Sequence, residues 1–210
     1  MKYISKDNMD LIKSLAQKSY DKKILRCVEK RLNHISKLLK DYKEGDIENI
    51  YLNECVSRQN LVTPVELTYE QLVQSWLSMP YEGKEFTSEC PVILTNNGMR
   101  VRSKSEKIMA DYFDSLGIKY KYECPLKLNS NRIVYPDFTF ISPYTRKEIY
   151  WEHEGMLDNP EYAKCAVKKL DSYAVNHIFP GENLILTFES SDTVINMNVI
   201  KEMTKKYLQS

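Results

Sequence analysis

The sequence predicts an α/β protein in which a helical N-terminal region precedes a domain of mixed strands and helices. Residues 20–42 carry apolar side chains at spacings of three and four, the period of one helical face. Residues 119–128, 131–142 and 147–155 instead read as strands, with helical patterns on either side of them. We therefore expect a helical region over residues 1–84, a connector over residues 85–98, and the α/β domain over residues 99–210.

The N-terminal region is expected to hold three helices. The apolar face of the first, residues 20–42, is formed by Ile24, Val28, Leu32, Ile35, Leu38 and Leu39. A short second helix is expected over residues 48–59. Thr68, followed by Gln71, opens a third helix that ends before Pro80. We expect the apolar face of the first helix to pack against the rest of the chain, with a dimer seam as the alternative.

The connector holds a short apolar strand next to an Asn-Asn-Gly turn at residues 96–98. After it the pattern predicts a helix over residues 101–117, ended by Gly117. The three strands follow. A helix over residues 161–177, a strand over residues 183–188 and a last helix from about residue 194 to residue 208 complete the α/β domain.

Composition excludes several classes of protein. Hydrophobic residues make up 42% of the chain and charged residues 28%, as in soluble globular domains, so a disordered chain is excluded. No apolar run is long enough to span a membrane, and the first ten residues are too polar for a signal peptide. We therefore expect a cytoplasmic protein without a membrane partner.

Cysteine usage and net charge narrow the class further. The five cysteines are scattered, with no CxxC pair and no histidine at zinc-ligand spacing, which predicts a reduced, zinc-free protein. Lys plus Arg number 30 and Asp plus Glu 29, so the chain lacks the bulk positive charge of a nonspecific nucleic-acid binder. Any contact with nucleic acid must come from a local patch.

Two carboxylates stand on neighbouring predicted strands. Asp137 follows Pro136 at the start of one strand, and Glu152 lies on the next strand across a short turn. Adjacent strands lie about 4.8 Å apart, so both carboxylates can reach a single ion. Hard cations such as Mg²⁺ or Mn²⁺ prefer carboxylate oxygens, and they polarise phosphoryl groups. The pair therefore predicts a metal site suited to phosphodiester hydrolysis.

With these residues in place, the chain resembles the PD-(D/E)xK nuclease superfamily over about residues 99 to 190. Pro136-Asp137 stands as the first half of the motif, and Glu152-His153-Glu154 as the second. The resemblance implies a restriction-endonuclease-like fold, a mixed central sheet flanked by helices, and metal-dependent hydrolysis of nucleic acid. It also implies that Glu106, on the helix before the strands, completes the site.

The chain departs from this pattern at the third motif position, where the superfamily usually has lysine and this chain has Glu154. Glu154 then binds metal or positions water. Lysines can migrate to the following helix, and Lys169 is the candidate because Tyr173 lies on the same helical face four residues later. His153 is expected to face away from Glu152, since side chains alternate along a strand.

A nucleic-acid contact surface is expected around the entry to the helix at residues 101–117. A helix N-terminus adds its own attraction for phosphate to that of basic side chains. A solvated charged face is the ordinary alternative for these residues. The candidates for contact are Arg100, Arg102 and Lys104 at this entry, together with Lys168 and Tyr173 on the helix expected over residues 161–177.

Two functions follow from this reading. The first is a Mg²⁺- or Mn²⁺-dependent nuclease, acting on DNA in preference to RNA, in which Asp137, Glu152 and Glu154 hold the metal and Lys169 stabilises phosphate charge. The second is a catalytically silent module that keeps the fold to bind nucleic acid or a protein, which the missing motif lysine favours. A homodimer or a protein partner is left open.

Overall fold

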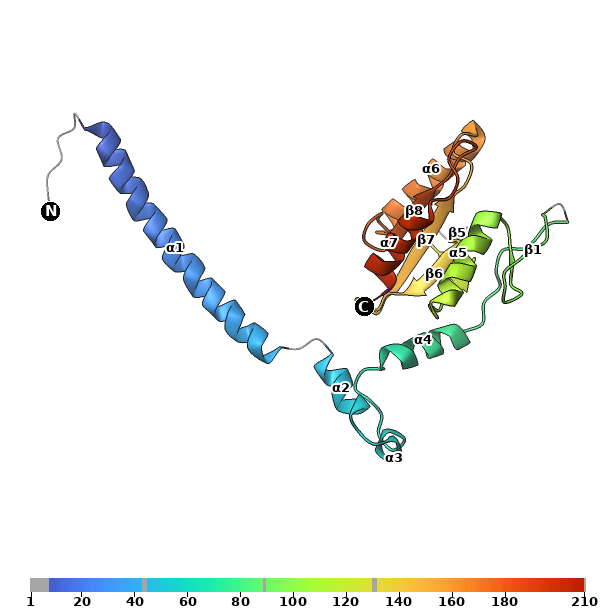
Figure 1. Ribbon diagram of the computed structural model, residues 1–210, viewed down its shortest axis with the longest axis horizontal. Coiled ribbons are helices and arrows are strands. Elements are labelled where there is room, and N and C mark those ends of the chain that lie inside the picture. Colours follow the sequence, from blue (N-terminus) through green and yellow to red (C-terminus); the bar gives the residue numbers. More distant parts are fainter. Residues whose placement is uncertain (1–7, 43–44, 89, 130–131, 210) are drawn as a thin grey trace. The chain divides into compact units, whose positions relative to one another are not determined.

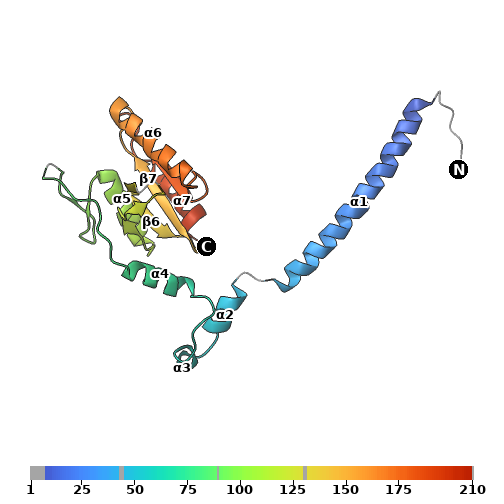
Figure 2. The same ribbon diagram turned by 180° about the vertical axis from the view of Figure 1, so that it is seen from behind.

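The computed structural model describes residues 8–42, 45–88, 90–129 and 132–209 (Figures 1 and 2). The chain divides into two compact units, Met1–Glu66 and Leu67–Ser210. Our expectation from the sequence placed the end of the helical region at residue 84. The division at residue 66 instead assigns the third predicted helix to the second unit.

The first unit consists of helices α1, Met9–Asp41, α2, Asp46–Leu52, and α3, Val56–Gln59. The first helix starts eleven residues earlier than its apolar pattern predicted. The single helix expected over residues 48–59 is split in two, because the backbone at Cys55 is extended. The Gln59 side chain donates back to the Tyr51 and Glu54 carbonyls across the break. None of the described side chains from residue 8 to residue 66 is buried.

The second unit begins with α4, Tyr69–Ser78, whose N-terminus carries the reciprocal capping box of Thr68 and Gln71. Side chains near both ends of the helix dock it on the sheet. The Trp76 indole N–H donates to Glu148 Oε1 at 2.8 Å, and the Tyr69 hydroxyl donates to the Ile141 carbonyl at 2.9 Å. These contacts and the apolar cluster around Trp76 make α4 part of the second unit.

A hairpin and a helix lead into the main sheet. Strands β1, Ile93–Leu94, and β2, Arg100–Val101, pair antiparallel around a turn in which Gly98 has a φ of +81°. Helix α5, Lys104–Ser115, is capped by the Ser103 side chain. The chain leaves the helix through Gly117, whose φ of +70° is a conformation that glycine adopts without strain.

The main sheet has the strand order β3-β6-β7-β8. Its strands are β3, Lys121–Tyr122, β6, Phe138–Ile141, β7, Glu148–Glu154, and β8, Leu184–Phe188. Strand β6 pairs antiparallel with both β3 and β7, whereas β7 and β8 are parallel. A parallel pair needs a crossover, which α6, Pro160–Val175, supplies, and α7, Met197–Leu208, follows β8.

Two of the expected strands are each interrupted. The chain turns at Glu123, which has a φ of +45°, so residues 119–128 give β3 and the separate β4, Leu126–Lys127. The run over residues 131–142 gives β5, Ile133–Val134, and β6; its first residue, Asn131, lies outside the described residues. Within the described residues, strands β4 and β5 pair with each other and with no other strand.

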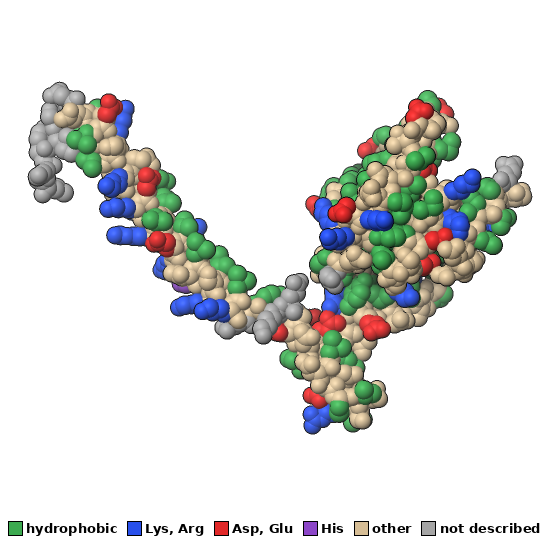
Figure 3. All heavy atoms as spheres, viewed as in Figure 1, with side chains coloured by type: hydrophobic (Ala, Val, Ile, Leu, Met, Phe, Trp, Pro, Cys, Tyr) green, Lys and Arg blue, Asp and Glu red, His purple; other side chains and the backbone are tan. Residues whose placement is uncertain are grey.

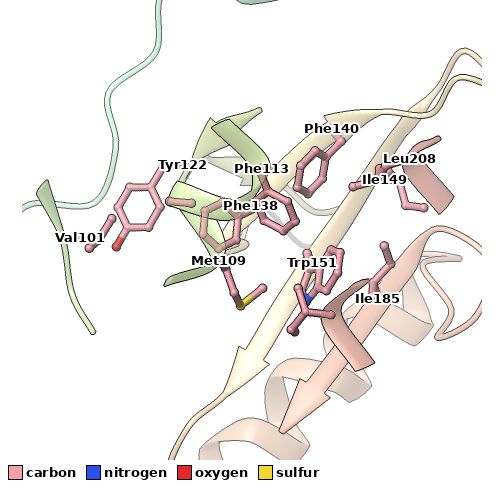
Figure 4. Packing of buried hydrophobic residues seen from close by; sticks show 12 residues of the cluster. Val101, Met109, Phe113, Tyr122, Phe138, Phe140, Ile149, Trp151, Ile185 and Leu208 are labelled. Carbon is pink, nitrogen blue, oxygen red and sulfur yellow. The ribbon is translucent and has the colours of Figure 1, made fainter. Parts of the chain in front are cut away.

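Both faces of the main sheet are covered by helices. On the face toward α5 and α7 the Phe113 ring packs against those of Phe138, Phe140 and Trp151, with centroids 5.1 to 5.3 Å apart (Figure 4). Tyr173 of α6 is buried on the opposite face, in a second cluster with side chains of β7 and β8. The predicted α/β class, with a mixed sheet flanked by helices, is confirmed.

Candidate functional site

The candidate site lies on the α6 face of β7. Alternation along this strand sends Trp151 into the core beneath α5 and Glu152 toward α6. The Glu152 side chain is almost fully buried, with 1% of its surface exposed. His153 points the other way, as alternation predicts, and its Nδ1 lies 2.9 Å from Thr187 Oγ1.

Two α6 side chains hold the Glu152 carboxylate. The Lys169 ammonium donates to Oε2 at 2.6 Å, and the Tyr173 hydroxyl donates to Oε1 at 2.5 Å. Lys169 and Tyr173 are four residues apart, so they meet the same partner from one helical face. Tyr173 is fully buried and its ring presents no surface to a nucleic acid. The hydroxyl of Tyr173 instead orients the carboxylate of Glu152.

Asp137 enters the site from the neighbouring strand. Its Oδ2 accepts the backbone N–H of His153 at 2.7 Å, which ties the start of β6 to β7 beside Glu152. Burial, and then the Glu152 charge, raise the pKa of the Asp137 carboxyl well above its ordinary value. Burial also raises the pKa of Glu152, against the opposing effect of Lys169. The two carboxylates are therefore close enough to disfavour each other's ionisation.

Lys169 provides positive charge at the site. Burial by itself lowers the pKa of its ammonium, but Glu152 and Asp137 raise it by more, and the pKa lies above its ordinary value. The group therefore keeps its proton at neutral pH. A protonated ammonium acts as an electrostatic group and cannot accept a proton from water.

Glu154 lies on the same side of β7 as Glu152 and is also buried. Its Oε1 has no hydrogen-bond partner among the described residues. Tyr162, in the first turn of α6, hydrogen-bonds the Glu154 carboxylate, and burial and this neighbour raise the pKa of the phenol. Our sequence reading missed Tyr162. Its spacing of seven residues from Lys169 was the signal that places it on the same helical face.

Glu106 is engaged in the local structure at the start of α5. Its Oε2 accepts the Arg102 backbone N–H at 2.9 Å and the Tyr122 hydroxyl at 2.6 Å. Its charge still contributes to raising the pKa of Asp137, after burial and Glu152. The charge of Glu106 therefore acts on the carboxylates of the site, while its hydrogen bonds brace the helix entry against β3.

The donor set has the chemistry that a hard divalent cation requires. The carboxylates of Asp137, Glu152 and Glu154 come from two neighbouring segments of the sheet, and Oε1 of Glu154 is buried without a hydrogen-bond partner among the described residues. A buried oxygen of this kind fits a cation, since it gains a ligand without losing a hydrogen bond. Within the described parts of the chain, no three acidic, histidine or cysteine side chains already converge as a metal cluster.

Most of the basic candidates lie elsewhere and serve other contacts. The guanidinium groups of Arg100 and Arg102 each lie 4.4 Å from the centroid of the Phe86 ring. Arg102 Nε also lies 2.6 Å from Glu123 Oε1, so its charge is paired. Both arginines thus anchor the segment before β1. Lys104 and Lys168 are exposed on α5 and α6.

Comparisons with known proteins give a limited match. No protein-family model matches the chain. Over 75 residues, 34% of this chain, the sequence is 41% identical to an uncharacterized protein of Methanocaldococcus jannaschii. The match covers 6% of that protein, so the chain spans only a small part of its relative's length. Among the described residues, no helix has both the length and the apolar character needed to cross a membrane.

Proposed function

We propose that this chain is a metal-dependent nuclease of the PD-(D/E)xK type that hydrolyses phosphodiester bonds of DNA. The observation that carries the proposal is the place of Asp137 and Glu152, on neighbouring strands and beside Lys169, with the buried Glu154 two residues further along β7. Three buried carboxylates beside one ammonium leave an excess of negative charge. A divalent cation offsets that charge.

The fold supports the same assignment. The PD-(D/E)xK resemblance implies a mixed sheet flanked by helices, and the observed sheet pairs β3, β6 and β7 antiparallel and β7 and β8 parallel between α5, α6 and α7. Asp137 and Glu152 occupy neighbouring strands of this sheet. The missing motif lysine has a counterpart in Lys169, whose ammonium reaches the carboxylate of Glu152 from α6.

In this proposal each residue has a distinct role. Asp137, Glu152 and Glu154 would hold Mg²⁺ or Mn²⁺, which when bound polarises a phosphoryl oxygen and activates water. Lys169 stays protonated and stabilises negative charge that develops on the phosphate. Tyr173 fixes Glu152, and Tyr162 fixes Glu154, so that the carboxylates keep their orientation.

The second candidate is a catalytically silent module that binds nucleic acid or protein. It is favoured by the observation that both Glu152 oxygens already have partners, Lys169 and Tyr173. A cation would have to share or displace one of these contacts. Against this candidate, a structural ion pair needs only one carboxylate per lysine, and the additional buried acids cost stability without a cation.

Cleavage of labelled DNA and RNA, single- and double-stranded, with Mg²⁺, Mn²⁺ or EDTA separates the two functions. We expect metal-dependent cleavage of DNA that Asp137→Asn and Glu152→Gln each reduce at least 100-fold. Glu161→Gln, which removes an exposed charge from the first turn of α6, serves as the matched control. Binding of the polymers without cleavage under any metal condition would select the silent module.

A further inference from the structure

Helix α1 carries an apolar stripe whose spacing is that of a coiled coil. Leu25, Val28, Leu32, Ile35 and Leu39 follow one another at alternating spacings of three and four residues, a heptad pattern in which a and d positions are apolar.

The stripe is exposed along its whole length. The large apolar side chains of α1 from Ile24 to Leu39 have between 45% and 69% of their surface exposed. Figure 3 shows hydrophobic side chains along one edge of α1 and basic side chains along the other. The described residues between 8 and 66 bury no side chain, so this unit forms no core of its own. A helix of this kind is stabilised mainly by packing its apolar face.

The residue types within the stripe indicate how many helices pack together. In the heptad register Leu25, Leu32 and Leu39 occupy a positions, while the β-branched Val28 and Ile35 occupy d positions. Leucine at a with a β-branched residue at d favours three or four strands over two. The flanking g positions 24 and 38 are Ile and Leu, which widen the apolar face as a four-helix core requires.

We propose that α1 is a self-assembly helix, and that four copies of the chain associate through a parallel four-helix coiled coil centred on residues 24–42. The occupant of each apolar stripe is therefore the same stripe of other copies. This assembly goes beyond the proposed nuclease and does not depend on it. Its consequence is that each assembly presents four copies of the second unit.

The charges of α1 agree with this arrangement. The helix contains nine basic and four acidic residues, yet the e and g positions between residues 24 and 42 hold only one charge of each sign, Glu29 and Arg31. Lys23, Lys30 and Lys37 occupy f positions, which point away from the seam. Like charges are thus kept out of the interface, where they would oppose association.

A membrane surface fits the stripe less well. Helices that lie in a membrane surface place Trp, Phe or Leu on the apolar face, and of these three α1 offers only leucine. Copies of α1 offer a matching surface.

The test is the mass of the full chain in solution, measured by light scattering and by sedimentation over a 100-fold range of concentration. We expect four times the chain mass of 24.7 kDa for the wild type. The seam variant Leu32→Asn, Ile35→Asn should fall fourfold to the monomer mass. The matched variant Lys30→Asn, Lys37→Asn, on the outer face, should keep the assembly.

Tryptophan fluorescence tests whether the seam variant has lost mass because its second unit is misfolded, since both tryptophans, Trp76 and Trp151, lie in that unit. It should stay unchanged in the seam variant. A monomeric wild type at all concentrations, whether or not it floats with anionic vesicles, would overturn the proposal. So would a seam variant that keeps the wild-type mass. A wild-type dimer or trimer that the seam substitutions dissociate into monomers would overturn the assembly of four helices.

Discussion

The Lys169 ammonium on α6 lies 2.6 Å from Glu152 Oε2 on β7, with the Tyr173 hydroxyl on the other oxygen of the same carboxylate. Seventeen residues separate Lys169 from Glu152 in the sequence. The contact exists because the crossover from β7 to the parallel strand β8 lays α6 over this face of the sheet. The predictions for the site follow from this ion pair and from the carboxylate of Asp137 beside it.

Lys169→Met should destabilise the fold strongly. Removing one partner of a buried ion pair leaves an uncompensated charge, which costs about 3–5 kcal/mol. Urea unfolding in metal-free buffer measures the change. Lys168→Met, on the exposed neighbour, should stay within about 0.5 kcal/mol of wild type. If Lys169→Met and Lys168→Met have equal stability, the pair has no structural role.

Asp137→Asn should stabilise the metal-free protein at neutral pH, because it removes a buried carboxyl whose ionisation the site disfavours. The folded protein holds the Asp137 proton more tightly than the unfolded chain, because the pKa is raised above its ordinary value of 3.8. This contribution to stability is present in full below about pH 3.8, and it is lost as the pH rises through the raised pKa.

The measurement for Asp137→Asn is thermal unfolding of both proteins between pH 4 and pH 8 in EDTA. The gain of the variant over wild type should grow with pH. In saturating Mn²⁺ the order should reverse, because a ligand that binds only the folded wild type adds about 2.7 kcal/mol at one hundred times its Kd. A variant that is less stable than wild type at pH 7 in EDTA would contradict the prediction.

Tyr173→Phe keeps the buried ring and removes only the hydroxyl that donates to Glu152 Oε1. A hydrogen bond to a charged group contributes about 1.5–3 kcal/mol, and we expect a loss of stability in that range. Metal affinity, measured by calorimetry with Mn²⁺, should fall about 10- to 100-fold, as when a group that orients a metal ligand is lost. Unchanged stability and affinity would show that Tyr173 only fills space.

A fragment of residues 67–210 should fold cooperatively, and a fragment of residues 85–210 should not reach the same stability. The shorter fragment loses α4, whose Trp76 is buried against the sheet and hydrogen-bonded to Glu148. Deleting a large buried aromatic side chain alone costs about 3–5 kcal/mol. Circular dichroism during heating compares the two fragments. Equal melting temperatures would place the boundary at residue 84 instead of residue 66.

Several features could be predicted from the sequence because neighbouring residues fix them. The alternation along residues 147–155 places Glu152 and His153 on opposite faces of the sheet, and the four-residue spacing of Lys169 and Tyr173 puts both on one face of α6. Thr68 and Gly117 mark helix ends at the expected places. Each signal spans only one or two turns of local structure.

Other features could not be predicted from the sequence, because they depend on contacts between distant segments of the chain. The partner of Arg102 is Glu123, which reaches it only because the backbone turns at that residue after β3. The spacing of Tyr162 from Lys169 places it on the same face of α6, but its contact with Glu154 and the docking of α4 on the sheet depend on tertiary packing.

The sequence by itself thus determined the order of helical and strand segments in the second unit, the facing of Glu152, and the heptad spacing of α1, because these depend on periods of a few residues. Only the tertiary structure decided which cation neutralises which carboxylate and where the second unit begins. Those outcomes depend on the strand order and on the crossover of α6, which bring together residues far apart in the chain.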